Sequence, residues 1–569
     1  MGSKAIALAS ALLAGGAYAW NWPHQQTAGN LTNSATSLTF LYQNNLNASD
    51  DVNHVPAILL DAQTHSDGAA ACVALGESLI SEATLRTHAN DFVNLLNYLQ
   101  YSRQGSRNGQ YFINNGVVSV SRFGTLNFLP RAYGNQKLPI LCTETQSKGN
   151  EAGNSVATAS NEITISAGGN TYVGFRNQKS FRWQGIPYTN TPGRWEYSTV
   201  YNKTGQTIDA TTYGPDCAQQ YDPTSQENCL FMNIQSPYIP KAGSKEGLKP
   251  VLVSIYGGGF TGGNSGPYSG LDTGNLASRD DIVGVQFNYR LSTLGFLAIP
   301  GTEIFGNFGI GDQVTALRWI KQNIAAFGGD PCQVTIIGES AGAGSVRALL
   351  GSPLVIEEDL IQGAVSQSNL GGGVDLGLSG DYGTTYSSYY TIDQSYAVAG
   401  QTIFADAGCD QTTLAAQIAC LKAVPAATLQ AFPAVARYVV QDGTIVNTEQ
   451  LIVSKKNGSV ADVPTIFGTT ENDGASFCNF PQHSITSEAQ GLEQSLGIDA
   501  YYANAIINSG LFPFYNTGNL SLDTFNVSQR VATDKTFRCI DEATMYGEFA
   551  SIPKKYLITA DHIHSQLAR

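Results

Sequence analysis

The sequence is poor in charged residues. Only 13% of its 569 residues are Asp, Glu, Lys or Arg, which is about half the share in an average globular protein. Acidic residues outnumber basic ones, 45 to 31, and leave a formal net charge of −14. Without a basic block the chain cannot neutralise phosphates, so no nucleic-acid partner is expected. Hydrophobic residues make up 42%, enough for a large core, which excludes wholesale disorder.

Long hydrophobic runs are also missing. No stretch reaches the roughly 18 uninterrupted apolar residues that a membrane-spanning helix needs. At the N-terminus, Lys4 precedes a short apolar stretch from Ala5 to Ala14, and Ala17-Tyr18-Ala19 offers small residues to signal peptidase. We interpret residues 1–19 as a signal peptide and expect a secreted, extracellular protein without a membrane span.

Clusters of cysteine and histidine with metal-ligand spacing are absent, and neither a metal nor a cofactor is predicted. The nine cysteines fit an oxidising compartment instead. Two pairs, Cys217 with Cys229 and Cys409 with Cys420, would close short loops, and Cys72 is placed to join Cys142. Cys332 precedes a predicted buried strand, so we expect a buried free thiol there. A secreted glycoprotein is also indicated by six N-x-S/T sequons, at Asn30, Asn47, Asn202, Asn457, Asn519 and Asn526.

Residues 20–158 lack an alternation of strands and helices. One helix is predicted, from Leu85 to Tyr98, because Leu85, Phe92, Leu95 and Leu96 fall on one face. Between Gln146 and Asn161 the composition turns to Ser, Gly, Asn and Ala, which is typical of a linker. We therefore divide the chain near residue 158. The N-terminal extension is either an elaboration, which we favour, or a small module that binds carbohydrate or cell wall.

Residues 159–569 have a different rhythm, in which short apolar strands alternate with helices. Strands are predicted at Val251–Ile255, Asp281–Val285, Val334–Ile337 and Val463–Phe467, and helices at Gln313–Phe327 and Ala341–Leu350. This pattern favours an α/β fold with a mainly parallel central sheet and helices on both faces. In such sheets, ligands and chemistry gather beyond the carboxyl ends of the strands.

The candidate nucleophile is Ser340. Gly338-Glu339-Ser340-Ala341-Gly342 matches G-x-S-x-G and lies between a β-branched strand and a helix, which is the setting of a nucleophile elbow. Glycines two residues before and after the serine let the chain turn sharply without Cβ clashes. The pattern alone is weak in a chain with 60 glycines, and the alternative is a glycine-rich turn with an idle serine.

A candidate oxyanion hole precedes this motif. Gly257-Gly258-Gly259 follows an earlier predicted strand, and glycine lets backbone amides approach a developing oxyanion closely. The amides of Gly258, Gly259 and Ala341 would provide three donors. The alternative is a flexible turn.

Residues 163–539 resemble the type-B carboxylesterase/lipase family, which includes cholinesterases and fungal lipases of the α/β-hydrolase fold. The resemblance rests on segments in the family's order: Phe181–Tyr188, Glu227–Ile234, Gly306–Gly309 with Asp312-Gln313, Phe327–Pro331 and the elbow. It implies a Ser–acid–His triad and disulfides between Cys217 and Cys229 and between Cys409 and Cys420. Tyr256 departs from the family, because many relatives carry histidine before the glycines.

The resemblance places the catalytic acid at Asp473, directly before Gly474 in the segment Gly468–Gly474. Most relatives use glutamate, but aspartate can also orient an imidazole. Glu471 is the alternative acid, since its longer side chain could reach from two residues away. A third interpretation is a turn closed by an Asx hydrogen bond.

The catalytic base must follow the acid on this fold. His483 is only ten residues after Asp473, too near for a separate loop, which leaves His564, with His562 as the alternative. After the signature Phe537-Arg538-Cys539, relatives continue into a strand, a Gly-x-x-His loop and a helix. Here Pro553-Lys554-Lys555-Tyr556 begins like that strand, and the resemblance then stops. A truncated or altered C-terminus and a solvated tail are the alternatives to a working base.

The sequence therefore predicts a secreted serine carboxylic ester hydrolase that acts through an acyl-enzyme on Ser340. Its expected partner is a small-molecule or lipid ester. Two alternatives stay open: a catalytically silent binding or adhesion glycoprotein on the same fold, and a C-terminally incomplete gene product. Glu339 is expected to support the site rather than react.

Overall fold

The structure is a computed structural model. It describes residues 35–121, 124–130, 135–145, 156–177, 179–267, 269–369, 389–447, 460–539, 541–542 and 555–559, the last by its backbone alone. The predicted signal peptide, the sequons at Asn30 and Asn457, and both C-terminal histidines lie outside these residues.

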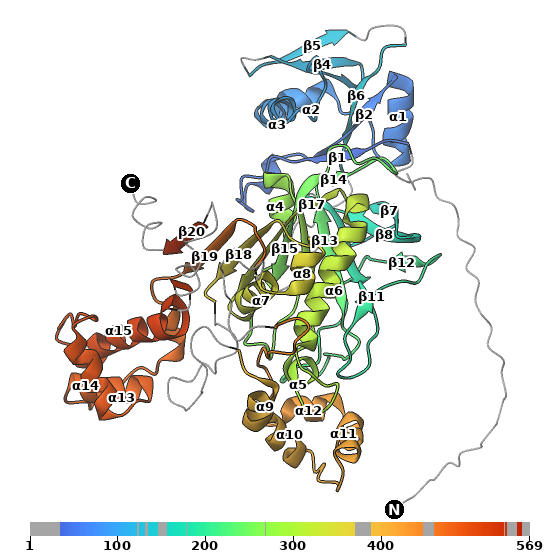
Figure 1. The fold of residues 1–569 in the computed structure, drawn as a ribbon. Helices are drawn as coiled ribbons and strands as arrows, with labels where there is room; N and C mark the ends of the chain where they lie inside the picture. The colour runs from blue at the N-terminus through green and yellow to red at the C-terminus, as the bar shows by residue number, and fades with distance from the viewer. Residues whose placement is uncertain are drawn as a thin grey trace, which may run out of the picture.

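An eleven-stranded sheet forms the centre of the fold (Figure 1). Its strands are β7 (Glu162–Ala167), β8 (Asn170–Arg176), β9 (Phe181–Pro187), β12 (Thr207–Asp209), β13 (Phe231–Ser236), β15 (Lys249–Ile255), β16 (Val283–Phe287), β17 (Gly329–Glu339), β18 (Gly363–Gln367), β19 (Thr465–Thr469) and β20 (Lys555–Thr559). They lie in the order β12-β8-β9-β13-β16-β15-β17-β18-β19-β20, and β7 pairs with β8. From β16 to β20 every neighbouring pair is parallel, so six carboxyl ends meet at one edge.

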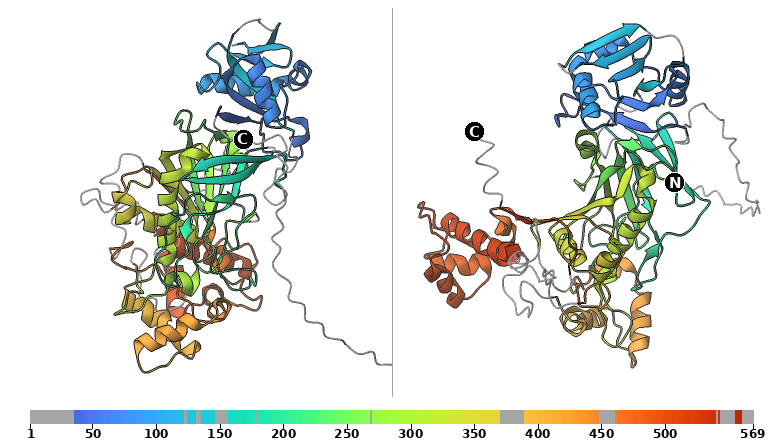
Figure 2. Two further views of the ribbon diagram at one scale, coloured as in Figure 1. Left: turned by 90° about the vertical axis from the view of Figure 1, so that its right-hand side faces the viewer. Right: turned by 45° about the horizontal axis from the view of Figure 1, so that its top comes forward.

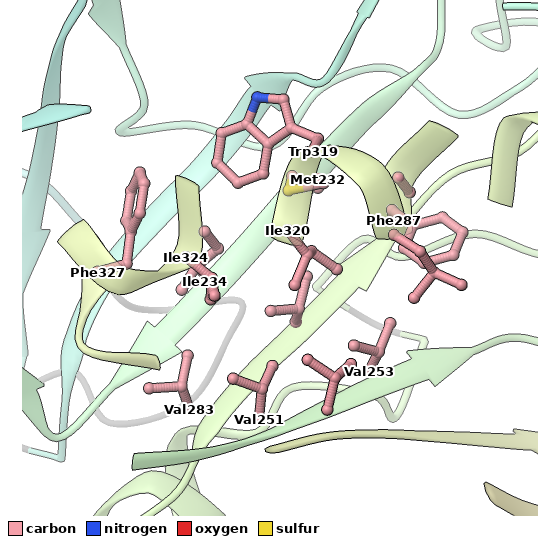
Figure 3. Packing of buried hydrophobic residues seen from close by; sticks show 14 of the residues in the cluster. Met232, Ile234, Val251, Val253, Val283, Phe287, Trp319, Ile320, Ile324 and Phe327 are labelled. Carbon is pink, nitrogen blue, oxygen red and sulfur yellow. The ribbon is translucent and has the colours of Figure 1, made fainter. Parts of the chain in front are cut away.

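Helices cover both faces of this sheet, as predicted. A Cβ on Gly284 of β16 would lie 1.7 Å from Oγ1 of Thr273, the residue before α4 (Gly274–Asp280). Gly284 thus faces α4, and its neighbour Val283 points to the opposite face, since side chains alternate along a strand. There α6 (Phe308–Asn323) and the turn after it pack on the strands. Figure 3 shows this core, made by Met232, Ile234, Val251, Val253, Val283, Phe287, Trp319, Ile320, Ile324 and Phe327.

The predicted elements around the motifs are present. Both α7 (Ala341–Leu350) and the strands β15, β17 and β19 lie where the sequence places them. The strand expected to begin near Tyr556 is also confirmed, because β20 pairs in parallel with β19. Each of these strands is short and largely apolar, which is typical of parallel strands buried on both faces.

Residues 35–145, blue in Figure 1, build a second sheet together with β14, and its strand order is β14-β1-β2-β6-β3-β4-β5. Its strands are β1 (Leu38–Leu41), β2 (Ala57–Gln63), β3 (Gln110–Ile113), β4 (Gly116–Val120), β5 (Leu126–Pro130), β6 (Leu138–Thr143) and β14 (Tyr238–Ile239). Three helices accompany it: α1 (His65–Ala74), α2 (Glu82–Thr87) and α3 (Ala89–Tyr101). The expectation of a single helix was therefore wrong, whereas strands and helices indeed do not alternate here, because the three helices follow one another between β2 and β3.

The predicted helix Leu85–Tyr98 is two helices that meet at His88. His88 has φ −110° and ψ 38°, outside the helical region, so α2 ends there and α3 begins. Leu85 of α2 and Phe92 and Leu96 of α3 are nevertheless buried in one cluster, while Leu95 is partly buried against it. The apolar pattern thus identified the buried face but not the break.

The remaining helices form two groups at the sides of the central sheet (Figures 1 and 2). One group contains α9 (Ile392–Ser395), α10 (Gln401–Asp406), α11 (Leu414–Ala423) and α12 (Ala426–Ala431), and the other contains α13 (Glu488–Leu496), α14 (Ala500–Ser509) and α15 (Leu520–Thr533). Smaller elements are β10 (Thr189–Asn190), β11 (Thr199–Val200), α5 (Ser292–Phe296) and α8 (Pro353–Glu357). Within the described residues, no helix is both long enough and apolar enough to cross a membrane.

All three expected disulfides are present: Cys72–Cys142, Cys217–Cys229 and Cys409–Cys420. The expectation for Cys332 was wrong, because its side chain is exposed. Cys332 sits in the outer part of β17, where its amide donates to Oδ1 of Asp330 (2.9 Å) in a turn. After the buried Gly329, the next buried residue of the strand is Val334.

Candidate active site

Ser340 stands on the turn between β17 and α7. Its backbone angles, φ 58° and ψ −119°, are ones that side-chain-bearing residues rarely adopt, and such a residue stores about 1–3 kcal/mol of strain. Two backbone hydrogen bonds hold the turn: the Ser340 amide donates to the carbonyl of Gln367 in β18, and the Gly344 amide donates to the carbonyl of Ser340, both at 2.9 Å. The serine is partly exposed at the carboxyl edge of the sheet.

Both glycines of the motif are required by their surroundings. A Cβ on Gly338 would lie 2.3 Å from the carbonyl group of Gly342, and a Cβ on Gly342 would lie 2.1 Å from the carbonyl oxygen of Ile255 in β15. Real Cβ atoms do not approach backbone this closely. Glycine is therefore needed at both positions, because the start of α7 packs tightly against β15 and β17.

The glycine loop after β15 lies against the nucleophile. A Cβ on Gly257 would stand 2.9 Å from Cβ of Ser340. Gly258 and Gly259 have positive φ angles of 105° and 63°, which glycine adopts without strain. In the described part of the chain, the amides of Gly258, Gly259 and Ala341 donate to no protein acceptor. These three amides are the donors that the sequence predicts for an oxyanion hole.

Tyr256, the departure from the family pattern, anchors this loop. Its ring stacks on Tyr289 with centroids 4.4 Å apart, and each hydroxyl donates to the other residue's carbonyl, at 3.0 and 2.9 Å. On the far side of the loop, Gly263 donates to Oε1 of Gln219 (2.9 Å), which lies in the loop closed by the Cys217–Cys229 disulfide. Sequence analysis did not assign either residue a role.

Asp473 follows β19 and lies two strands away from the elbow. Its Oδ2 accepts hydrogen bonds from Oγ of Ser368 (2.7 Å) and from the amide of Thr470 (2.8 Å), and Thr470 Oγ1 donates to Oδ1. Ser368 directly follows Gln367, the residue whose carbonyl holds Ser340. The elbow and the candidate acid are thus joined through the end of β18. Sequence analysis missed Ser368 and Thr470, whose roles become visible only through their hydrogen bonds to Asp473.

Two further carboxylates, those of Glu471, the alternative acid, and Glu339, are both exposed. Glu339 lies beside the glycine loop, since a Cβ on Gly257 would be 2.9 Å from its Oε2. Partial burial, together with the negative charge of Asp473, raises the pKa of Glu339 above its ordinary value of 4.5. The carboxylates of Glu339 and Asp473 are thus electrostatically coupled.

The described histidines do not complete a triad. Three of them lie in the N-terminal sheet unit: His54 pairs with Asp91 (2.9 Å), His65 bonds to the carbonyl of Ile113 (3.0 Å), and His88 bonds to the carbonyl of Asn53 (2.9 Å). His483 is exposed, with its ring against Phe480. His562 and His564 lie outside the described residues, so their assignment stays a prediction.

Comparison with known families decides the identity of the fold. Residues 164–539, more than half of the chain, match the carboxylesterase family. The chain belongs to the carboxylesterase family. Its fold is accordingly the α/β-hydrolase fold, and the resemblance seen in the sequence is confirmed.

This carboxylesterase-family chain is similar to several curated proteins over about a third of its length. It is 38% identical to a para-nitrobenzyl esterase of Bacillus subtilis (strain 168) over 205 residues, which are 33% of this chain and 40% of the relative. It is 39% identical to the bile salt-activated lipase of Rattus norvegicus over 225 residues, 38% of this chain and 34% of the relative. It is 42% identical to liver carboxylesterase 1 of Oryctolagus cuniculus over 196 residues, which are 34% of this chain and 31% of the relative. Each match spans less than half of the relative's own length.

Proposed function

We propose that this protein is a secreted serine hydrolase of carboxylic esters that acts through an acyl-enzyme on Ser340. One observation carries the proposal: the Ser340 turn lies against a glycine loop in which the amides of Gly258 and Gly259, like that of Ala341, are free of protein acceptors among the described residues. Free amides beside a strained serine are what acyl transfer needs and what a structural turn does not.

In the proposed reaction, Oγ of Ser340 attacks the ester carbonyl carbon while its proton passes to an imidazole. The carbonyl oxygen becomes an oxyanion, which the three amides stabilise. The C–O bond to the alcohol then breaks, and the alcohol leaves with the proton from the imidazolium. Water, activated by the same imidazole, cleaves the acyl-enzyme and releases the acid.

Asp473 is the proposed carboxylate that orients the imidazole, and its hydrogen bonds to Ser368 and Thr470 support this role by fixing its position. We propose His564 as the base, with His562 as the alternative, because both follow β19 and Asp473 as the fold requires. Glu471 is the less suitable acid, since it is exposed.

The proposed substrates are small-molecule or lipid esters, and the printed names of the relatives, an esterase and a lipase among them, support this class. Secretion is supported by the leader with Ala17-Tyr18-Ala19 and by the three disulfides. Residues 20–158 and 159–569 stay the proposed division of the chain after the leader.

The test is hydrolysis of p-nitrophenyl butyrate by the full-length secreted protein. Ser340→Ala should lower kcat/KM about a thousandfold or more, whereas Ser160→Ala, at an exposed serine far along the chain, should leave it unchanged. If His564 is the base, His564→Ala should lower kcat/KM as much as Ser340→Ala does. If His562 is the base, His562→Ala should have that effect instead. A folded wild type without hydrolysis would instead favour the silent binding protein.

A further inference from the structure

A cleft of about 580 Å³ lies where the N-terminal sheet meets the central fold. Its walls come from β1, β2, β6 and the loop after α3 on one side, and from β14 and the start of β15 on the other. The two sides are joined through the antiparallel pair of β1 and β14, which Figure 1 shows at the boundary. Neither the elbow nor the glycine loop contributes to it.

The cleft concentrates positive charge. Five of its 21 lining residues are Lys or Arg, against 31 of 569 in the whole chain, and only Asp61 and Glu246 oppose them. Four of the cations are exposed at the rim, and in the described part of the chain their side chains make no ion pair or hydrogen bond: Arg103, Arg107, Lys137 and Lys241. A chain with net charge −14 thus gathers free cations at one cavity.

The fifth cation, Lys249, is buried and serves the structure. Its Nζ donates to Asp281 (2.7 Å) and to Gln104 of the N-terminal unit (2.5 Å), so its charge is balanced. Because Lys249 is paired, the four rim cations face the cleft against two carboxylates and leave an excess of two positive charges. The excess would attract an anion.

We propose that this cleft binds an acidic polysaccharide. The rim cations come from three separate segments of both units, which suits charges spaced along a polymer better than one compact anion. Hydroxyl and amide groups that can bond to sugar hydroxyls also line the cleft, from Ser37, Thr39, Ser106, Asn108 and Ser244. The single aromatic residue of the lining, Tyr238, lies under Lys249 and donates its hydroxyl to the carbonyl of Glu246 (2.9 Å), so no free ring is offered to a nucleobase.

The proposed cleft is separate from the proposed active site. Lys249 begins β15, and Gly257 of the candidate oxyanion loop comes just after the opposite end of the same strand. Polysaccharide bound at the cleft therefore lies at the amino edge of the parallel strands and leaves the carboxyl edge open. The cleft would hold the protein on an acidic matrix while esters are cleaved elsewhere.

The test measures binding of hexagalacturonate, with maltohexaose as the neutral probe, to the full-length protein by calorimetry at low and high salt. Wild type should bind hexagalacturonate, bind it more weakly at high salt, and not bind maltohexaose. Arg103→Glu with Lys241→Glu should weaken binding tenfold or more. Lys203→Glu with Lys422→Glu carries the same charge change at exposed lysines outside the cleft and should have little effect.

Several results would overturn the proposal: no binding by wild type, equal losses in the two double variants, or tighter binding of a single-stranded DNA of the same charge. If the double Glu variant does not fold, Arg103→Gln with Lys241→Gln replaces it and should still weaken binding. Hydrolysis of p-nitrophenyl butyrate should be equal in all these variants, so a failure of the cleft is distinguishable from a failure of the active site.

Discussion

Glu339 is electrostatically coupled to the candidate acid. It directly precedes Ser340, it lies against Gly257, and its pKa is raised by partial burial and by the charge of Asp473. A carboxylate whose folded-state pKa is raised is less favourable in the ionised form when the protein is folded than when it is unfolded. At neutral pH, therefore, the ionised carboxylate of Glu339 lowers the free energy of unfolding.

Replacing Glu339 by glutamine should stabilise the protein at pH 7. Below the ordinary pKa of 4.5, the Glu339 carboxyl of wild type is protonated in the folded and in the unfolded state. The stabilisation by glutamine should therefore shrink as the pH falls from the raised pKa of the folded state to 4.5. Thermal unfolding at pH 7 and pH 4 measures it. The control Glu471→Gln, at another exposed carboxylate, should leave Tm unchanged at pH 7 and at pH 4. An increase in Tm from Glu339→Gln that is equal at the two pH values would contradict the account.

For single residues, the sequence predicted features that depend on local steric contacts and missed contacts between residues of neighbouring strands. Gly338 and Gly342 were expected from the turn that Ser340 needs, and backbone contacts now explain both. Ser368 was missed because its contact with Asp473 joins residues 105 positions apart. Cys332 was misplaced because proximity to a strand does not say where along the strand burial begins.

Helices and strands were predictable from the sequence where they form continuous apolar runs in the core. The parallel strands β15, β17 and β19 and helix α7 were found from their apolar runs, because both faces of the sheet are covered. The N-terminal sheet was missed, since its edge strand β14 comes from another part of the chain, where Ile239 pairs with Leu38 of β1, 201 residues earlier. The break at His88 was missed because the apolar pattern continues across it.

The Cys72–Cys142 disulfide ties α1 to β6 across 70 residues of the N-terminal sheet unit. Replacing both cysteines by serine should lower the free energy of unfolding of this unit by about 2–5 kcal/mol, because the open loop regains conformational entropy. Hydrogen exchange should show the loss in residues 35–145, with the central sheet as internal reference. Exchange that rises equally in both sheets would contradict independent stabilisation of the N-terminal unit.

On the scale of the whole molecule, buried ion pairs join the two sheets. Arg176, at the end of β8, contacts Glu77 (3.2 Å) and Glu144 (2.5 Å) of the N-terminal unit, and all three side chains are buried. Its Nη2 also donates to the carbonyl of Leu75 (2.6 Å). The N-terminal unit is thus fastened by polar contacts whose partners lie between 32 and 101 residues apart, which local sequence patterns do not reveal.

Arg176→Met should destabilise the protein by about 3–5 kcal/mol, because two carboxylates are left buried without a countercharge. The triple variant Arg176→Met, Glu77→Gln, Glu144→Gln should recover much of this loss, since no buried charge remains unpaired. Urea unfolding of both variants provides the measurement. A triple variant as unstable as Arg176→Met alone would show that the loss does not come from the unpaired carboxylates.

The central claim is that Ser340 is an activated nucleophile beside an oxyanion hole. Its most direct test is labelling of the full-length protein with a fluorophosphonate, followed by peptide mass spectrometry. The account predicts one modified residue, Ser340, with labelling abolished by Ser340→Ala and retained in Ser160→Ala. A folded wild type that takes up no label, or takes it up at another serine, would contradict it.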